Sequence, residues 1–243
     1  MAKTKGLEML RAAAPTVSIG VVTANLLLLG SEISLLERTG AKLAHVDVMD
    51  GCFCPMMTVG PPFIKAIKTS LLKDVHLMIE EPLEKVAEYV AVGADMITIH
   101  VEACSNVHRV LQKLGTLTNA NDAERGIVRG VALNPGTPLE ALEPLLDELE
   151  YIVLLAVNPG WGGQKYIRST TGRIARVQRM IADSGKNIIL GADGGITKEN
   201  IAEVAATGAD VIVAGSAVFD GKTPEANARF MLEAVSAANG SRR

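Results

Sequence analysis

The chain has 243 residues, 48% of them hydrophobic and only 3% aromatic, so its length permits one large core built from aliphatic side chains. The formal net charge is -3 and the basic residues are dispersed, which argues against nucleic acid as a partner. No apolar run reaches the roughly 18 residues of a membrane span, and the N-terminus lacks the apolar stretch of a signal peptide, so we expect a cytoplasmic protein with no membrane contact.

The first fifteen residues mix charges with apolar positions, and we expect them to form an N-terminal extension at the surface. Residues 16–243 are expected to form a single catalytic domain. Within it, one pattern occurs three times, at 37–48, 89–101 and 204–216: a helical stretch, a glycine and an apolar run. The glycine suits the left-handed position just past a helix, and the apolar run suits a strand buried on both faces.

Five further strands are predicted, each separated from the next by a segment of helical period. They lie at 16–22, 73–78, 127–133, 151–157 and 187–190. Together with the three repeats they make eight strands alternating with helices, and no linker interrupts them. This order predicts a closed (β/α)8 barrel, the TIM barrel, with an open doubly wound sheet as the alternative. The polar stretch at 116–126 is expected to be a surface loop.

A barrel of this kind carries its chemistry at the carboxyl ends of its strands. Polar residues stand at seven of those predicted ends, in chain order His45 and Asp47, His76, His100 and Glu102, Asn134, Asn158, Asp193, and Ser216. For His100 and Glu102 we expect a structural hydrogen-bonding role rather than metal ligation.

Four of these residues form a candidate metal site. His45 and Asp47 are two apart on a strand, so their side chains point to the same face. His76 and Asp193 can converge on the same point from other strands. Two imidazoles and two carboxylates suit one divalent ion such as Zn, Fe(II), Mn or Co. The alternative for each histidine is a hydrogen-bonded interior residue, but burying two carboxylates without a cation or a shared proton is costly.

Glycine-rich segments at neighbouring strand ends form a candidate phosphate site. They are VNPGWGGQK at 157–165, ADGGI at 192–196 and VAGSAVF at 213–219. Each taken alone could be a turn, but together their backbone N–H groups can converge on one phosphate. The sequence therefore predicts a phosphate ester as substrate, bound by Gly160, Gly162, Gly163, Gly194, Gly195, Gly215 and Ser216.

From about Thr23 to Phe219 the chain resembles the ribulose-phosphate 3-epimerase family. The motifs that carry the resemblance occur in the family's order and at its spacings: HVDVMDGCFCP, TVGPPF, DVHLMI, IHVEA, LNPGTP, VNPGWGGQK, ADGGI and GSAVF. The resemblance implies a TIM barrel of the ribulose-phosphate-binding type that forms a homo-oligomer and acts on a small phosphorylated ketose.

The resemblance also implies roles for individual residues. A divalent metal would be held by His45, Asp47, His76 and Asp193. The two aspartates would act as acid and base in the inversion of C3 that interconverts D-ribulose 5-phosphate and D-xylulose 5-phosphate. Met49 and Met78 match methionines that line the family's pocket, although ordinary core positions are an equal interpretation for them.

Four positions near the expected pocket depart from the family's pattern: Gly20, Cys52, Met56 and Leu155. They leave open a 3-epimerase of another ketose phosphate, such as allulose 6-phosphate or a tetrulose phosphate. Two further alternatives are a phosphoribosyl-type lyase or isomerase barrel, which does not need the four-residue metal set, and a non-catalytic barrel that binds phosphosugars.

Overall fold

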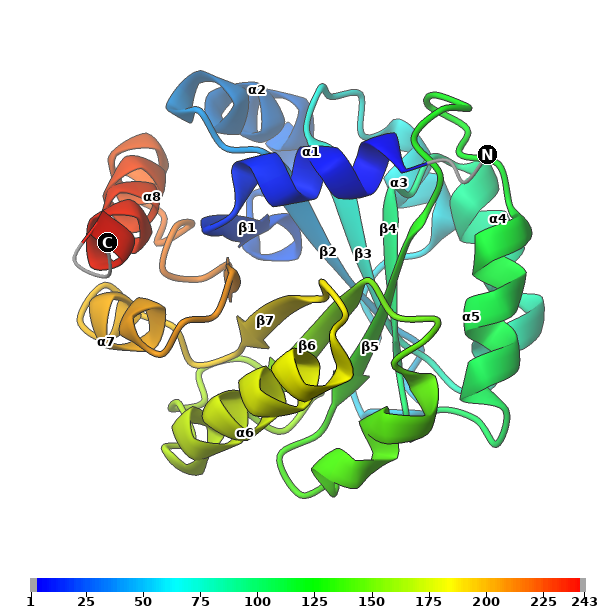
Figure 1. Cartoon of the computed structure of the whole chain (residues 1–243). Coiled ribbons are helices and arrows are strands. Elements are labelled where there is room, and N and C mark those ends of the chain that lie inside the picture. Colours follow the sequence, from blue (N-terminus) through cyan, green and yellow to red (C-terminus); the bar gives the residue numbers. More distant parts are fainter. Residues whose placement is uncertain (1–3, 241–243) are drawn as a thin grey trace.

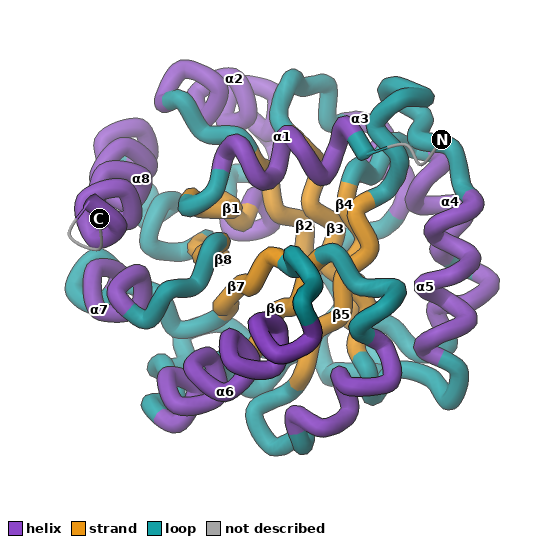
Figure 2. The backbone as a smooth tube through the Cα atoms, in the orientation of Figure 1, coloured by secondary structure: helices purple, strands orange, loops and turns teal. Residues whose placement is uncertain are grey.

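Eight parallel strands form a closed barrel in the computed structural model, which describes residues 4–240. Each strand pairs with the next along the chain, and β8 pairs with β1 (Figure 2). The closed order confirms the predicted TIM barrel and rules out the open doubly wound sheet. The strands are β1 (Thr16–Gly20), β2 (Leu43–Met49), β3 (Leu72–Met78), β4 (Met96–His100), β5 (Val128–Leu133), β6 (Tyr151–Leu155), β7 (Ile189–Asp193) and β8 (Val211–Ala214).

The helices surround the strands (Figure 1). They are α1 (Lys5–Ala13), α2 (Leu29–Thr39), α3 (Pro61–Ala66), α4 (Val86–Ala91), α5 (Val107–Thr116), α6 (Ser169–Ser184), α7 (Ile201–Ala206) and α8 (Pro224–Gly240). Short 3-10 helices occur at Val21–Thr23, Leu26–Leu28, Pro82–Glu84 and Leu139–Leu145. The last of these connects β5 to β6 in place of an α-helix, and it contains Pro144, which lacks the N–H that a helix interior requires.

Alternation along the strands separates two apolar cores. Residues that point outward, such as Val46, Val75 and Ile97, pack under the helices in one cluster. Residues that point into the barrel form a second cluster with two side chains of α1: Leu7, Leu10, Leu43, Leu72, Met96, Val128, Ala132, Tyr151, Val153, Leu155, Ile189 and Val211. The end of the barrel nearest α1 is therefore filled mainly by apolar side chains.

The N-terminal extension differs from the expected surface tail. Residues 5–13 form α1, whose Leu10 is fully buried against the amino ends of the strands. Its first turn is held to the loop before β5 by an ion pair between Lys5 and Asp122 at 2.6 Å and by the Gly6 N–H, which donates to the Arg125 carbonyl. The charged residues of this segment alternate with apolar ones at the spacing of an amphipathic helix, whose apolar face is buried. The prediction of a surface tail is therefore wrong for the part that the structure describes.

The other boundaries follow the prediction closely. The strand expected at 187–190 begins two residues later, at Ile189, and runs to Asp193. The predicted loop at 116–126 follows the end of α5, and its Asn119 is buried, with its side-chain amide donating to Asp95 and to the Gly126 carbonyl. Over residues 4–240, no helix has the length and hydropathy needed to cross a membrane. Residues 1–3 and 241–243, which belong to the predicted extension and domain, lie outside the described residues.

Candidate active site

A cavity of about 740 Å³ opens at the carboxyl ends of the strands, where the sequence predicted the chemistry. Asp47 and Asp193 line its floor, and His45 and His76 lie beneath it, each 1% exposed. Each of these four side chains lies on or at the end of a barrel strand, so the sheet itself determines its direction. The structure thus brings all four predicted metal ligands together.

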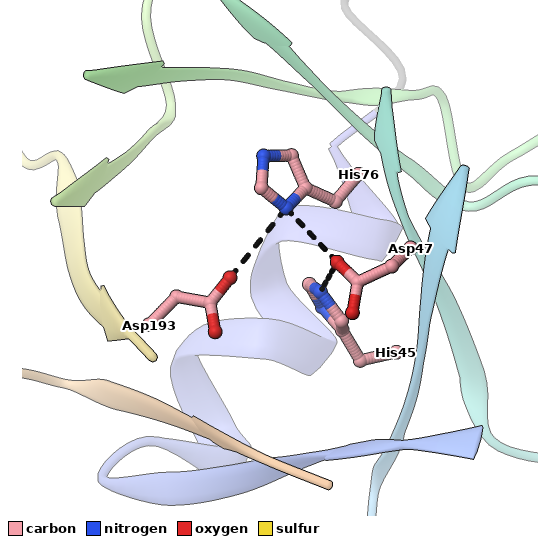
Figure 3. A group of neighbouring side chains, drawn as sticks. All are labelled: His45, Asp47, His76 and Asp193. Atoms are coloured by element: carbon pink, nitrogen blue, oxygen red, sulfur yellow. Dashed lines mark hydrogen bonds and ion pairs between the residues drawn. The ribbon is translucent and has the colours of Figure 1, made fainter. Parts of the chain in front are cut away.

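The four side chains meet around one point (Figure 3). His76 Nδ1 lies 3.2 Å from Asp47 Oδ1 and 3.5 Å from Asp193 Oδ2, while His45 Nε2 lies 3.1 Å from Asp47 Oδ1. One nitrogen or oxygen from each residue lies within 4.8 Å of those of the others. Asp47 reaches the cluster from β2 and Asp193 from β7, so the two carboxylates approach it from different sides of the barrel.

The far nitrogen of each imidazole has its own partner. His45 Nδ1 lies 2.8 Å from Asp74 Oδ2, which also accepts a hydrogen bond from the Ser18 hydroxyl at 2.7 Å. His76 Nε2 lies 2.9 Å from His100 Nε2, and His100 Nδ1 lies 3.0 Å from Glu102 Oε2. Because Asp74 accepts from His45 Nδ1–H, a neutral His45 presents its Nε2 lone pair to the cluster.

The charges of the cluster oppose the cost of burial. Burial lowers the pKa of both imidazoles, but Asp74 and Asp47 raise the pKa of His45 well above its ordinary value, and Asp193 and Asp47 raise that of His76 to about 9. Burial also raises the pKa of Asp47, which His45 and His76 nevertheless hold well below its ordinary value. In the absence of a cation these raised pKa values favour the protonated imidazoles, and a cation bound there must displace those protons.

This donor set fits a divalent cation. Two imidazole nitrogens and two carboxylate oxygens are ligands that first-row divalent metals accept, and two carboxylates balance a double positive charge. Outer partners that fix the imidazoles are typical of metal sites. His45, Asp47, His76 and Asp193 would hold the ion. The donor atoms alone do not select among Zn, Fe(II), Mn and Co.

His100 has the opposite electrostatic behaviour. Burial lowers its pKa to about 4, a shift that Glu102 opposes by accepting its Nδ1–H. The pKa of Glu102 is lowered, because hydrogen bonds from His100, Thr137 and the Asn134 N–H outweigh the effect of burial. His100 is therefore a neutral ring beside an ionised carboxylate, and it lies outside the group of four converging ligands.

The predicted phosphate-binding residues lie along one wall of the cavity. Gly160, Gly162, Gly163, Gly194, Gly195, Gly215 and Ser216 all line it. The Gly194 and Gly195 backbones have φ of 102° and 69°, a left-handed conformation that favours glycine. A side chain at Gly195 would also collide with the backbone of Tyr166. This turn therefore requires glycine, whatever ligand it binds.

The two methionines and three of the four departures from the family pattern also face the cavity. Met49 and Met78 line it, as do Gly20, Met56 and Leu155. Cys52 is different: it lies in a separate depression beside Phe53, Glu80, Glu81, Glu102 and Cys104. Cys52, expected near the pocket, therefore does not line the cavity, because the turn after β2 places it in this depression.

Sequence reasoning missed several residues of the site. Asp74 is two positions before His76, so strand alternation alone puts both on the same face, and that signal was available. Lys165 and Arg168 line the cavity at the end of the glycine-rich β6–α6 loop. Thr58 also lines the cavity, where its hydroxyl donates to the Asp47 carbonyl and accepts from the Met49 N–H. It returns from the β2–α3 loop, so no local pattern announced it.

Comparisons with known proteins agree with these features. Residues 16–219 match the model of the "Ribulose-phosphate 3 epimerase family". The ribulose-phosphate 3-epimerase of Bacillus subtilis is 41% identical over 206 residues, covering 84% of this chain and 91% of that protein. The chloroplastic ribulose-5-phosphate-3-epimerase of Arabidopsis thaliana is 40% identical over 210 residues, covering 85% of this chain and 72% of that protein.

Solved structures of low identity share the barrel. The 3-hexulose-6-phosphate synthase of Salmonella typhimurium superposes with a TM-score of 0.64 at 16% identity, covering 92% of this chain and 99% of that one. The 3-keto-L-gulonate-6-phosphate decarboxylase of Vibrio cholerae gives a TM-score of 0.63 at 13% identity, covering 92% of this chain and 98% of that one. At these identities the similarity establishes the fold alone.

Proposed function

The chain belongs to the ribulose-phosphate 3-epimerase family, and from this premise we propose that it inverts C3 to interconvert D-ribulose 5-phosphate and D-xylulose 5-phosphate. The observation that carries the proposal is the pair Asp47 and Asp193, which reach one cluster from β2 and β7 at the floor of the cavity. Inversion at carbon requires proton removal on one face and proton delivery on the other.

In the proposed reaction one aspartate removes the C3 proton of the bound ketose phosphate and the other delivers a proton to the opposite face. In the reverse direction the two aspartates exchange roles. His45 and His76 hold the pKa of Asp47 below its ordinary value, so Asp47 is a carboxylate, the form that can accept a proton. A divalent cation, held by these four residues, would stabilise the negative charge that develops on the substrate oxygens.

The substrate's phosphate is proposed to bind at the glycine-rich wall, through backbone N–H groups of the β6–α6 loop, of Gly194 and Gly195, and of Gly215 and Ser216. Lys165 and Arg168, both at the same wall, add positive charge for a dianion. Binding there leaves C3 free to lie over the two aspartates, because the wall and the floor belong to one cavity. Met49 and Met78 are proposed to pack against the carbon chain of the sugar.

A second candidate is the same reaction on another ketose phosphate. It is favoured by Gly20, Met56 and Leu155, which line the cavity and offer no polar side chain to sugar hydroxyls. A missing hydrogen bond to a hydroxyl costs about 1 kcal/mol or more and changes which sugar is preferred. Allulose 6-phosphate and a tetrulose phosphate are the sugars to compare.

The test is epimerisation of ribulose 5-phosphate by the purified protein, with both alternative sugars measured in parallel. Chelation should abolish turnover, and readdition of Zn(II), Mn(II) or Fe(II) should restore it and identify the preferred ion. Turnover on another ketose phosphate only would support the second candidate. Inactivity on all three sugars in the metal-loaded protein would refute both and favour a phosphosugar-binding role.

Two further proposals concern location and assembly: a cytoplasmic location and a homo-oligomeric state. Two exposed apolar side chains support the second: Leu27, in the 3-10 helix after β1, is 95% exposed, and Met57, after β2, is 76% exposed. Light scattering of the purified protein measures the oligomeric state directly, and a monomeric mass at micromolar concentration would contradict it.

A further inference from the structure

We propose that His100 and Glu102 are positioning residues that fix the tautomer of His76, so that its Nδ1 lone pair is held toward the cation site. The inference rests on the metal site of the proposed function, but it concerns two residues outside the set of four ligands. It follows from a chain of hydrogen bonds that leads from the cluster into the loops behind it.

The hydrogen bonds lead from His76 of the cluster to His100 and then to Glu102. His76 Nε2 lies 2.9 Å from His100 Nε2, and His100 Nδ1 lies 3.0 Å from Glu102 Oε2. His76 is 1% exposed and His100 is fully buried, so no solvent replaces these contacts. The ring of Phe53 packs on His100 with 4.6 Å between ring centroids and restrains its orientation.

The identity of the groups determines where the protons lie. An ionised carboxylate only accepts, so His100 Nδ1 must donate to Glu102. The other nitrogen of a neutral ring carries a lone pair, so His100 Nε2 accepts. His76 Nε2 must therefore donate. The remaining lone pair of a neutral His76 is then on Nδ1, the atom that lies 3.2 Å from Asp47 and 3.5 Å from Asp193.

Glu102 is itself held so that both of its oxygens must accept. Its Oε1 receives the Asn134 N–H at 2.8 Å and the Thr137 hydroxyl, while Oε2 faces His100. A glutamine at this position has one acceptor oxygen for donors on two sides. Its NH2 group would face either His100 Nδ1–H or the Asn134 N–H. When the NH2 group faces His100 Nδ1–H, two donors oppose each other. That clash is removed only if His100, and then His76, changes tautomer, which places a proton on His76 Nδ1, the atom that faces the cation site.

The competing explanation is that His100 and Glu102 only satisfy each other's hydrogen bonds inside the barrel. That role predicts lower stability on substitution but no change in the metal affinity of the folded protein. The two explanations therefore differ in a measurement that does not depend on turnover.

The experiment measures Co(II) affinity of the metal-free protein by competition with a chromophoric chelator, together with the Co(II) absorption spectrum and urea unfolding. Glu102→Gln is compared with Thr137→Val, which removes one hydrogen bond to Glu102 but keeps the carboxylate. His100→Phe, which has no acceptor, is compared with His100→Gln, whose amide oxygen can accept the His76 Nε2–H.

We expect Glu102→Gln and His100→Phe to bind Co(II) about 10- to 100-fold more weakly and to change its spectrum, since such losses are typical when outer partners of metal ligands are removed. The Co(II) affinity of Thr137→Val and of His100→Gln should stay within about threefold of that of the unsubstituted protein, because both variants keep an acceptor on which the tautomer of His76 depends. Equal affinity and spectra in all four folded variants would overturn the inference. If the unsubstituted protein binds Co(II) but does not epimerise any ketose phosphate, the proposed function fails and the inference stands.

Discussion

Replacing each aspartate in turn tests the two-base arrangement most directly. Asp193→Asn keeps an oxygen near His76 but removes the ability to take or deliver a proton, and Asp47→Asn does the same on the other side. General acid–base groups contribute about 10²- to 10⁴-fold, which corresponds to about 2.7 to 5.4 kcal/mol of transition-state stabilisation. We expect kcat for epimerisation to fall by that factor in each variant. In samples that keep the bound metal, KM should change by less than about threefold, because the phosphate contacts are intact.

The assay that separates the two carboxylates is proton exchange in D2O, followed by NMR. An enzyme with one remaining base can still remove and return a proton on one face of C3. Each variant should therefore incorporate deuterium into only one of the two epimers, and Asp47→Asn and Asp193→Asn should label opposite epimers. Asp183→Asn, the same change on the exposed part of α6, is the matched control and should behave as the unsubstituted protein.

Two outcomes would refute this reasoning. One is a kcat within about tenfold of the unsubstituted value in either variant, far above what loss of an acid or base allows. The other is labelling of the same epimer by both variants, which would mean that both carboxylates serve one face. The bound metal per chain must be measured in every sample, since each aspartate is also a proposed ligand.

Three further outcomes are expected. Leu10→Ala should lower the free energy of unfolding, measured in urea, by about 2 to 5 kcal/mol because it leaves a cavity in the core. The kcat of the folded protein should not change, because α1 closes the end of the barrel opposite to the site. A loss of less than about 1 kcal/mol would contradict the burial of this helix. Gly195→Ala, which drives a side chain into the backbone of Tyr166, should raise KM and weaken inorganic phosphate as an inhibitor, whereas Gly40→Ala has a similarly left-handed φ with open space around it and should affect stability only. Metal binding should strengthen as the pH rises, because the pKa of His76 is raised to about 9 and a bound cation must displace its proton below that pH. For each displaced proton, the apparent association constant should fall about tenfold when the pH is lowered by one unit. An affinity that does not change between about pH 6.5 and 8.5 would contradict the protonated cluster.

Strand alternation explains why so much of the site could be predicted. His45 and Asp47 face the same way because they are two apart on β2, and Asp193 ends a parallel strand of the same closed sheet. Asp74 follows the same rule relative to His76 and could have been found by it. Where the direction of a side chain depends only on strand period, the sequence is sufficient.

Other residues could not be predicted because loop geometry determines where they go. Cys52 lies three positions after the end of β2, in the same loop as the cavity residue Met56, yet the turn places it in a separate depression. Thr58 returns from the β2–α3 loop to hold the Asp47 carbonyl. In both cases the position depends on the path of a loop, which has no repeating period.

The sequence alone determined the eight-strand alternation, the four converging His and Asp side chains and the glycine-rich wall, because each of these depends on local period and chain order. Only the tertiary structure decided what supports them. It shows that α1 packs against the amino ends of the strands and closes that end of the barrel. It also shows that His76 contacts His100, which in turn contacts Glu102. The physical reason is that these contacts join residues through barrel closure and strand register, which bring side chains together across the sheet, while a sequence pattern reports only the face on which each side chain lies.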